Sequence, residues 1–372
     1  MSRFFAWARR EAVLSISFVL ALTTCLFVPP TLATLSQIDF RTLALLFCLM
    51  AAVSGLANTG LLPRLSAALL GRARSARSLA ALLALLCFFS SMVMTNDVAL
   101  IAFVPLTLMT LDRAGLGALN IPVVVLETVA ANLGSALTPV GNPQNLYLYS
   151  YYRMTPGAFF SATVPLCALS LALILCLVFA VRVKGPLRIE PDQPAPLQAK
   201  RLLLHVGVFA LCLLTVFSVV DWRVTLLVVV LALALFDRPV FRRVDYALLM
   251  TFVCFFIFSG NLGSIPAVRG ALTALMDKSA FFAALTASQV VSNVPAALLL
   301  SPFTENARAL VLGTDVGGLG TVIASLASLI SFKFYLRQEG ARAGRYLLRF
   351  TLINLILLLP LIALSLLLLR AG

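Results

Sequence analysis

The chain has 372 residues, of which 61% are hydrophobic and 11% are charged, and its mean hydropathy is +1.04. A soluble domain has about 45–50% apolar and about 25% charged residues, so this composition excludes a soluble fold and predicts lipid as the surrounding solvent. The formal net charge is +14, but the basic residues lie between apolar runs, which favours the positive-inside rule over nucleic-acid binding.

Apolar runs long enough to cross a bilayer core of about 30 Å recur along the whole chain. The first run, 13–28, follows three arginines and has no small-residue cleavage site, so we expect a retained span with the N-terminus in the cytoplasm. The basic loops all fall on the cytoplasmic side only if two segments, 78–111 and 278–302, do not cross the membrane. We therefore expect each of these segments to enter and leave on the same side, as a re-entrant hairpin. The chain then crosses the plasma (cell inner) membrane about nine times.

The cysteines and the single histidine indicate no metal centre. All seven cysteines lie in apolar runs without a Cys-x-x-Cys pair, and His205 has no partner histidine. We therefore expect neither a disulfide framework nor a resident cofactor.

Three local patterns occur twice in the same order. They are Ser54-Gly55 and Ser259-Gly260, Ser91 to Asp97 and Ser288 to Val294, and Asn132 to Asn142 and Asp315 to Ser325. The charge topology runs the partner segments in opposite directions, so the patterns predict inverted repeats, the usual construction of secondary transporters. The expected fold class is an all-α polytopic membrane protein with two inverted repeats, each with a re-entrant hairpin and a broken transmembrane helix.

The expected organisation has two halves and a linker. Its parts are a first half at 1–183 with a hairpin at about 78–111 and a broken helix at about 121–152, a cytoplasmic linker at 184–201, and a second half at 202–372 with a hairpin at about 278–302 and a broken helix at about 309–336.

Polar residues interrupt the hairpins and the broken helices. At a hairpin tip, small hydroxyl and amide side chains either cap unpaired backbone groups or bind an ion, and repetition at equivalent places favours binding. In a broken helix, exposed N–H groups attract anions and freed carbonyls coordinate cations, whereas the alternative is a glycine kink for close packing. The candidate substrate- and ion-binding residues are Thr95, Asn96, Asp97, Asn132, Gly134, Ser135, Thr138, Gly141, Asn142, Asn145, Ser292, Asn293, Asp315, Gly317, Gly318, Thr321 and Ser325.

Three carboxylates lie in or near apolar surroundings: Asp97, Glu127 and Asp315. A charge inside the membrane is costly and marks a functional candidate. Glu127 is open to two interpretations, an ion or proton carrier and a buried structural partner. The four tyrosines between Tyr147 and Tyr152 predict an aromatic belt at the outer membrane surface.

At the paired tips and breaks the chain resembles the ion transporter superfamily, which includes divalent anion–sodium symporters, citrate transporters, arsenite pumps and a sodium–proton antiporter branch. The segments that carry the resemblance are 95–100 with Pro105, 131–145, 292–295 and 317–321. The resemblance covers nearly the whole chain and is closest to the citrate-transporter-like anion transporter branch. It implies a homodimer in which a moving transport domain slides against a scaffold domain, an elevator-type mechanism.

The resemblance also implies a set of sodium ligands. They are Thr95, Asn96, Gly134, Ser292, Asn293 and Gly317. The third tip position departs from the symporters, which have threonines that contact a dicarboxylate; here it is Asp97 in one repeat and Val294 in the other. An aspartate at a tip resembles the arsenite and sodium–proton branches.

Three hypotheses follow. The leading one is a secondary transporter, not an enzyme, that moves a small organic or inorganic anion coupled to Na⁺ or H⁺. The second is a Na⁺/H⁺ antiporter that uses Asp97 and Asp315 as exchangeable carboxylates. A remote third is an intramembrane enzyme in which the same two acids share a proton. The expected partners are the anion, the lipid bilayer and a second copy of the chain.

Overall fold

A computed structural model describes residues 11–179 and 196–371, and every regular element in these two ranges is a helix. The helices in chain order are α2 (Ala12–Phe27), α3 (Leu32–Ser36), α4 (Phe40–Ala57), α5 (Leu61–Leu70), α6 (Ala76–Ser91), α7 (Asn96–Arg113), η1 (Gly117–Leu119), α8 (Asn120–Ser135), α9 (Pro143–Tyr151), α10 (Pro156–Phe179), α11 (Ala199–Val216), α12 (Trp222–Phe236), η2 (Arg238–Arg243), α13 (Tyr246–Ser264), α14 (Pro266–Val291), α15 (Asn293–Leu300), η3 (Ser301–Phe303), α16 (Ala307–Gly317), α17 (Leu326–Leu336) and α18 (Ala343–Arg370). Most of the expected linker, 184–201, lies outside the described residues.

Six of the described helical stretches are long and apolar enough to cross a membrane. They are Phe40–Ala57, Gly117–Ser135, Pro156–Phe179, Ala199–Val216, Tyr246–Ser264 and Ala343–Arg370. The all-α, multi-pass fold class is therefore confirmed. Five further apolar helices, α2 among them, are shorter than 18 residues, and the expected number of about nine crossings stays a prediction.

Side-chain caps fix where several helices begin. Asp39 accepts a hydrogen bond from the Thr42 N–H at the start of α4, and Asp245 accepts one from the Leu248 N–H at the start of α13. Both caps satisfy backbone donors that have no partner inside the helix. These two helices, α4 and α13, are also the ones that contain the repeated Ser54-Gly55 and Ser259-Gly260 pattern.

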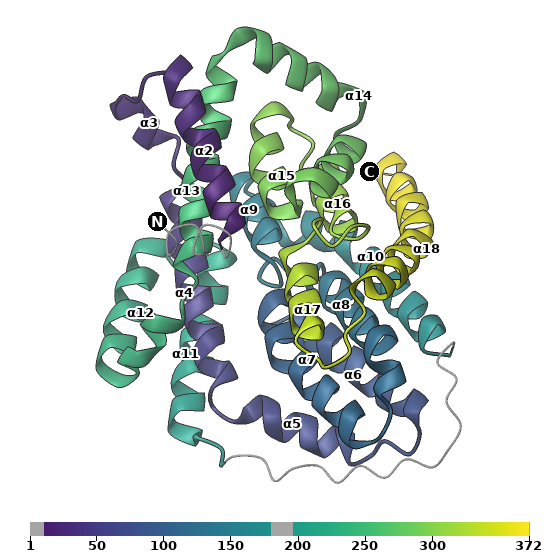
Figure 1. Cartoon of the computed structure of the whole chain (residues 1–372). Coiled ribbons are helices and arrows are strands. Elements are labelled where there is room, and N and C mark those ends of the chain that lie inside the picture. Colours follow the sequence, from purple (N-terminus) through teal and green to yellow (C-terminus); the bar gives the residue numbers. More distant parts are fainter. Residues whose placement is uncertain (1–10, 180–195, 372) are drawn as a thin grey trace, which may run out of the picture.

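The helices form two groups that lie side by side (Figure 1). On the left, α4 packs against α11 and α12, and α2 packs against α13. On the right, α8 is enclosed by α6, α7, α10 and α17. Two helices connect the groups at opposite ends of the molecule: α5 at the bottom of the view, and the first part of α14 at the top.

Helix α14 is not one continuous rod. The backbone of Ser279 leaves the helical region, with φ −170° and ψ 98°, and the Ser279 hydroxyl accepts a hydrogen bond from the Phe282 N–H at 3.3 Å. Ser279 therefore ends one helix and caps the next. The second part of α14 and α15 are then the two arms of a short hairpin whose turn is at Ser292.

A buried polar cluster joins α11 to the end of α12. His205 Nε2 lies 2.8 Å from Asp237 Oδ2, and the guanidinium of Arg201 donates two hydrogen bonds to the same carboxylate. The His205 ring fills the space beside Gly55 of α4, where any side chain would overlap it. The cluster thus locks three helices of the left-hand group together.

We expect Asp237→Asn to lower the thermal midpoint of unfolding at neutral pH. Burial alone would raise the pKa of Asp237, but the hydrogen bonds from Arg201 and His205 and the charge of Arg201 outweigh it and lower the pKa. A lowered pKa means that the stabilisation is present above the unfolded-state pKa of about 4 and is lost as pH falls below it. The stability gap between wild type and variant should therefore close in acid, as scanning fluorimetry at a series of pH values can measure; a gap that widens in acid contradicts the assignment.

Candidate functional site

Two hairpin tips reach the two interrupted helices with the same hydrogen bond. The Asn96 N–H donates to the Gly141 carbonyl at 3.1 Å, and the Asn293 N–H donates to the Ala324 carbonyl at 2.9 Å. In both tips the asparagine Oδ1 accepts the N–H of the next residue at 3.0 Å. The tip asparagines are therefore backbone caps, and they also fix each hairpin to an interruption.

The two tips differ in backbone strain. Ser292 has φ 77° and ψ 154°, a region that favours glycine, whereas Thr95 at the other tip has φ −54° and ψ 150°. Non-glycine residues in such regions persist where the surrounding structure holds them, which is common at binding sites and switches. The strain is therefore confined to the second tip.

The interruptions are the non-helical segments 136–142, between α8 and α9, and 318–325, between α16 and α17. Gly134 packs on α6, where a Cβ atom would overlap the Phe88 carbonyl oxygen and lie 2.8 Å from Ser91 Oγ. Gly317 packs on the second part of α14, where a Cβ atom would lie 2.7 Å from Ser288 Oγ. Both glycines thus permit a close approach of each hairpin to its broken helix.

Four helices point their N-termini at one small space. Its lining residues are Asn96 and Asp97 of α7, Pro143 and Gln144 of α9, Asn293 and Val294 of α15, and Ser325 and Leu326 at the start of α17, together with Leu248. Each N-terminus carries a partial positive charge, and the first N–H groups of α7 and α15 are already bonded within the tips. The space itself measures about 10 Å³, so the field of these N-termini acts on an anion in the adjoining cavity of about 290 Å³, which shares Asp97 and Pro143 with it.

Side chains from one interrupted helix cross to the other. Asp315 of α16 accepts hydrogen bonds from Asn145 Nδ2 at 2.9 Å, from Asn142 Nδ2 at 3.2 Å and from Gln144 Nε2 at 3.5 Å. All four side chains are buried. The Asp315 carboxylate thus lies against the first turn of α9.

An equivalent contact runs from the first interrupted helix to the start of the second half of the other. Asn132 of α8 accepts from Ser325 Oγ at 3.0 Å, and it donates to Ser328 Oγ at 3.2 Å. The separation from Asn132 to Asp315 in sequence equals that from Asn142 to Ser325 and that from Asn145 to Ser328. The two crossings are therefore equivalent in position and differ in charge. Asn132 also accepts from Asn96 Nδ2 at 3.0 Å, which ties the first tip into the network.

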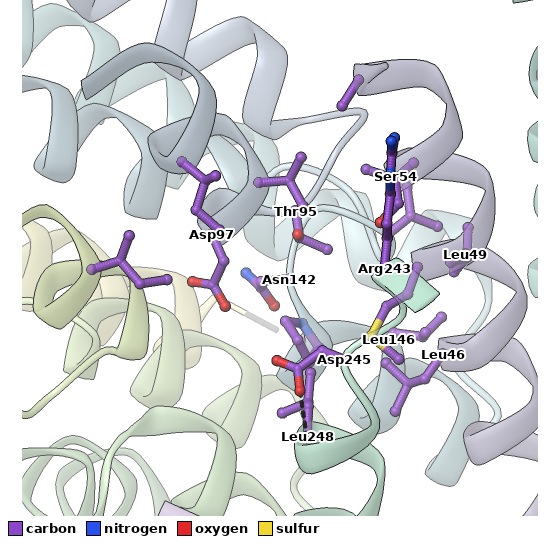
Figure 2. Close-up of a pocket in the computed structure, with 18 of the residues that line it drawn as sticks. Leu46, Leu49, Ser54, Thr95, Asp97, Asn142, Leu146, Arg243, Asp245 and Leu248 are labelled. Atoms are coloured by element: carbon purple, nitrogen blue, oxygen red, sulfur yellow. Dashed lines mark hydrogen bonds between the residues drawn. The ribbon is translucent and has the colours of Figure 1, made fainter. Parts of the chain in front are cut away.

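A cavity of about 290 Å³ opens beside the first tip (Figure 2). Apolar side chains of α4 form one wall, and its polar lining comes from Ser54, Asn58, Thr95, Asp97, Asn142, Arg243 and Asp245. Figure 2 shows the carboxylates of Asp97 and Asp245 facing the same space, with Asn142 close by. Within the described part of the chain, the half-buried Asp97 carboxylate has no hydrogen-bond partner.

Most of the residues singled out in the sequence lie in or beside this network. Those with a side-chain or tip contact already given are Asn96, Asn132, Asn142, Asn145, Asn293, Asp315 and Ser325. Ser135 accepts from Asn142, the Thr138 hydroxyl donates to the Met92 carbonyl, and Ser292 Oγ donates to the Ala324 carbonyl. Gly318 lies against Asn293, and the Thr321 N–H donates to Gln289 Oε1.

Five site residues were missed in the sequence, and one is Gln144, which donates to Asp315. Gln289 spans the second interruption, donating to the Gly317 and Leu319 carbonyls at 2.7 and 2.8 Å, and Ser328 bonds Asn132. Arg243 and Asp245 line the cavity opposite Asp97. A signal existed for Gln144, which lies in the polar segment 141–145, and for Gln289, which lies inside the repeated Ser288 to Val294 pattern, but not for the other three.

The structure corrects the interpretation of the tyrosines and locates Glu127. The aromatic belt is wrong for Tyr147 and Tyr149, which are buried, because α9 is an internal half-helix whose Tyr147 packs on Phe252 and Phe256 of α13. Glu127 lies apart from the cavity lining and is fully buried, with its Oε1 accepting from Thr107 Oγ1 at 2.5 Å.

A bundle of membrane-length helices whose polar interruptions meet at its centre is the construction of a membrane transporter. The chain belongs to the citrate transporter family, because the model described as "Citrate transporter" matches residues 4–330. It is 32% identical over 327 residues to the uncharacterized transporter MJ0456 of Methanocaldococcus jannaschii, covering 88% of this chain and 89% of that protein.

Two further relatives are similar to this chain in sequence. The inner membrane protein YbiR of Escherichia coli is 31% identical over 304 residues, 80% of each chain. The magnetosome protein MamN of Paramagnetospirillum magneticum is 31% identical over 142 residues, 38% of this chain and 32% of that protein.

Proposed function

We propose that this transporter moves a small anion, an organic acid such as citrate or a dicarboxylate or an inorganic oxyanion, coupled to Na⁺ or H⁺. The observation that carries the proposal is the convergence of four helix N-termini on the space beside Asp97. The partial positive charges of helix N-termini attract an anion without a basic side chain, which suits a site inside the membrane.

In this proposal, Asp97 couples the binding of the anion to the binding of the cation or proton. Ionised, its carboxylate lies among the four N-termini and repels an incoming anion; neutralised by a proton or paired with a cation, it does not. Cation and anion therefore favour each other's binding, which is the thermodynamic requirement for symport. If the coupling ion is Na⁺, we propose that it binds near the two tips and the two glycines that pack against the hairpins, at Thr95, Asn96, Gly134, Ser292, Asn293 and Gly317.

We propose further that the right-hand helix group moves as an elevator against the left-hand group. In support, each hairpin tip is hydrogen-bonded to an interruption, while the α4 wall of the cavity belongs to the left-hand group. The protein works as a homodimer in the plasma membrane with its N-terminus in the cytoplasm, and the two hairpins re-enter from opposite sides as parts of inverted repeats.

Uptake into proteoliposomes tests the proposal. Purified protein is reconstituted, and labelled citrate, succinate, phosphate and arsenate are offered with an inward Na⁺ gradient, an inward H⁺ gradient or neither. We expect uptake of at least one anion to require one of the gradients. Absence of movement for the whole panel, in vesicles whose protein is shown to be folded, contradicts anion transport.

A Na⁺/H⁺ antiporter is the second candidate, favoured by the two interior carboxylates Asp97 and Asp315. Sodium-driven proton flux without any anion present, recorded with a pH-sensitive dye, would support it over the first proposal. An enzyme with the same two acids is disfavoured because both Asp315 oxygens accept amide hydrogens, and no hydrogen bond joins Asp315 to Asp97 among the described residues.

A further inference from the structure

The Asp315 carboxylate has amide neighbours but no positive partner. It is 2% exposed, and its hydrogen bonds come from the neutral side chains of Asn142, Gln144 and Asn145. Within residues 11–179 and 196–371, no lysine, arginine or histidine forms an ion pair with it. An interior carboxylate without a counter-charge is costly and indicates a partner supplied from outside the chain.

Two of the same amides leave oxygen atoms without donors. Gln144 Oε1 and Asn145 Oδ1 are both buried and have no hydrogen-bond partner. Buried acceptors of this kind are uncommon, because each one loses its contact with water. Three side chains at one place thus offer carboxylate and amide oxygens and lack a positive group to bind them.

Oxygen atoms in this combination are ligands for a hard cation. The amide nitrogen and oxygen exchange places when the side chain turns about its last bond, and the choice between them follows the hydrogen-bond network. With a cation beside Asp315, the orientation that points Gln144 Oε1 and Asn145 Oδ1 inward becomes the favourable one. The same three side chains then satisfy all their oxygens.

We propose that Asp315, Asn145 and Gln144 form a Na⁺ site at the crossing of the two interrupted helices. The inference rests on the proposed cation coupling, assigns Na⁺ as an ion of the transporter and gives it ligands other than the hairpin tips. Only one of the two equivalent crossings carries the charge, because Asn132 replaces the aspartate at the other. One such site is therefore expected in each chain.

The test uses Na⁺ as the probe and stability as the readout. The thermal midpoint of the full-length protein in detergent is measured against NaCl, with choline chloride holding ionic strength constant and KCl in a parallel series. We expect a saturable rise with Na⁺ alone, since an ion that binds only the folded state stabilises it. Asp315→Asn should abolish the rise, and Asn145→Ala should raise the half-saturating Na⁺ concentration about tenfold, the factor that 1.4 kcal/mol represents.

Two control variants locate the ion. Asn354→Ala changes another buried asparagine, on α18, whose Oδ1 has no hydrogen-bond partner and whose amide donates to the Phe350 carbonyl, and it should leave the Na⁺ response of the thermal midpoint intact. Asp112→Asn removes a carboxylate near the far end of α7 and should also retain the response. The site is refuted if wild type responds equally to choline or K⁺, if Asp315→Asn keeps the full response, or if Asp112→Asn loses it. Should Asp315→Asn not fold, an unchanged half-saturating concentration in Asn145→Ala refutes the site.

The outcome is separable from that of the proposed function. If the thermal midpoint rises with Na⁺ only when Asp315 is present, but vesicles take up no anion, the ion site is supported and anion transport is contradicted. If a proton gradient drives anion uptake but the thermal midpoint does not change with Na⁺, anion transport is supported and the ion site is contradicted.

Discussion

Asp97→Asn should leave a folded protein whose anion binding no longer depends on the coupling cation. In wild type we expect the cation to strengthen anion binding by roughly 5- to 150-fold, the range of 1–3 kcal/mol typical of coupling between sites. The amide keeps the shape of the side chain but cannot be ionised, so the repulsion that the cation relieves is absent. Anion affinity in the variant should match that of the cation-loaded wild type, and gradient-driven accumulation should be lost.

Equilibrium binding of labelled anion at several Na⁺ concentrations and pH values measures this effect. Asp112→Asn is a matched control on the same helix, because Asp112 lies near the far end of α7, where it accepts a hydrogen bond from Asn120 at 2.9 Å. Cation-dependent anion affinity that survives in Asp97→Asn would exclude Asp97 as the coupling carboxylate.

Gly134→Ala should have a large effect on folding. The added Cβ atom would overlap the Phe88 carbonyl oxygen and lie 2.9 Å from the Phe88 carbonyl carbon. These are backbone atoms in the last turn of α6, so they cannot rotate away as a side chain can. Overpacking of this kind costs about 1–3 kcal/mol or more, and here it would separate the first hairpin from α8.

Thermal unfolding in detergent and binding of anion to the purified variant measure the loss. Gly157→Ala on α10 is the control, because nothing lies within 4 Å of the Cβ atom that it would add. Gly317→Ala should also destabilise the protein, because its added Cβ atom would lie 2.8 Å from Ser288 Cβ and 3.1 Å from Leu285 Cα. A Gly134→Ala variant as stable as Gly157→Ala would contradict the close α6–α8 contact.

The sequence was informative where the chemistry is local. Glycine, proline and asparagine interrupt apolar runs for reasons that act within a few residues, so the tips at Asn96 and Asn293 and the interruption that ends at Asn142 could be placed from pattern alone. The repetition of these patterns also identified which polar residues to consider together.

Long-range contacts were beyond that reasoning. Asp315 bonds Asn142, Gln144 and Asn145, about 170 residues earlier in the chain, and only the packing of α16 on α9 brings them together. The contribution of Arg243 and Asp245 to the cavity likewise depends on how the left-hand group lies against the first tip. Tyr147 and Tyr149 were misjudged because a half-helix surrounded by protein has the same composition as one at a lipid interface.

The interruption of α14 at Ser279 has a mechanical consequence. A continuous helix would transmit any rotation of its first part directly into the hairpin tip at Ser292. With separate capping at Ser279, the first part can change its angle while the hydrogen bonds of the second part stay intact. At the other end, Gly60 has φ 84° in the turn between α4 and α5, so the connection formed by α5 also begins at a joint. Each of the two connecting segments thus contains a break in regular helix, as the proposed movement of one helix group past the other would require.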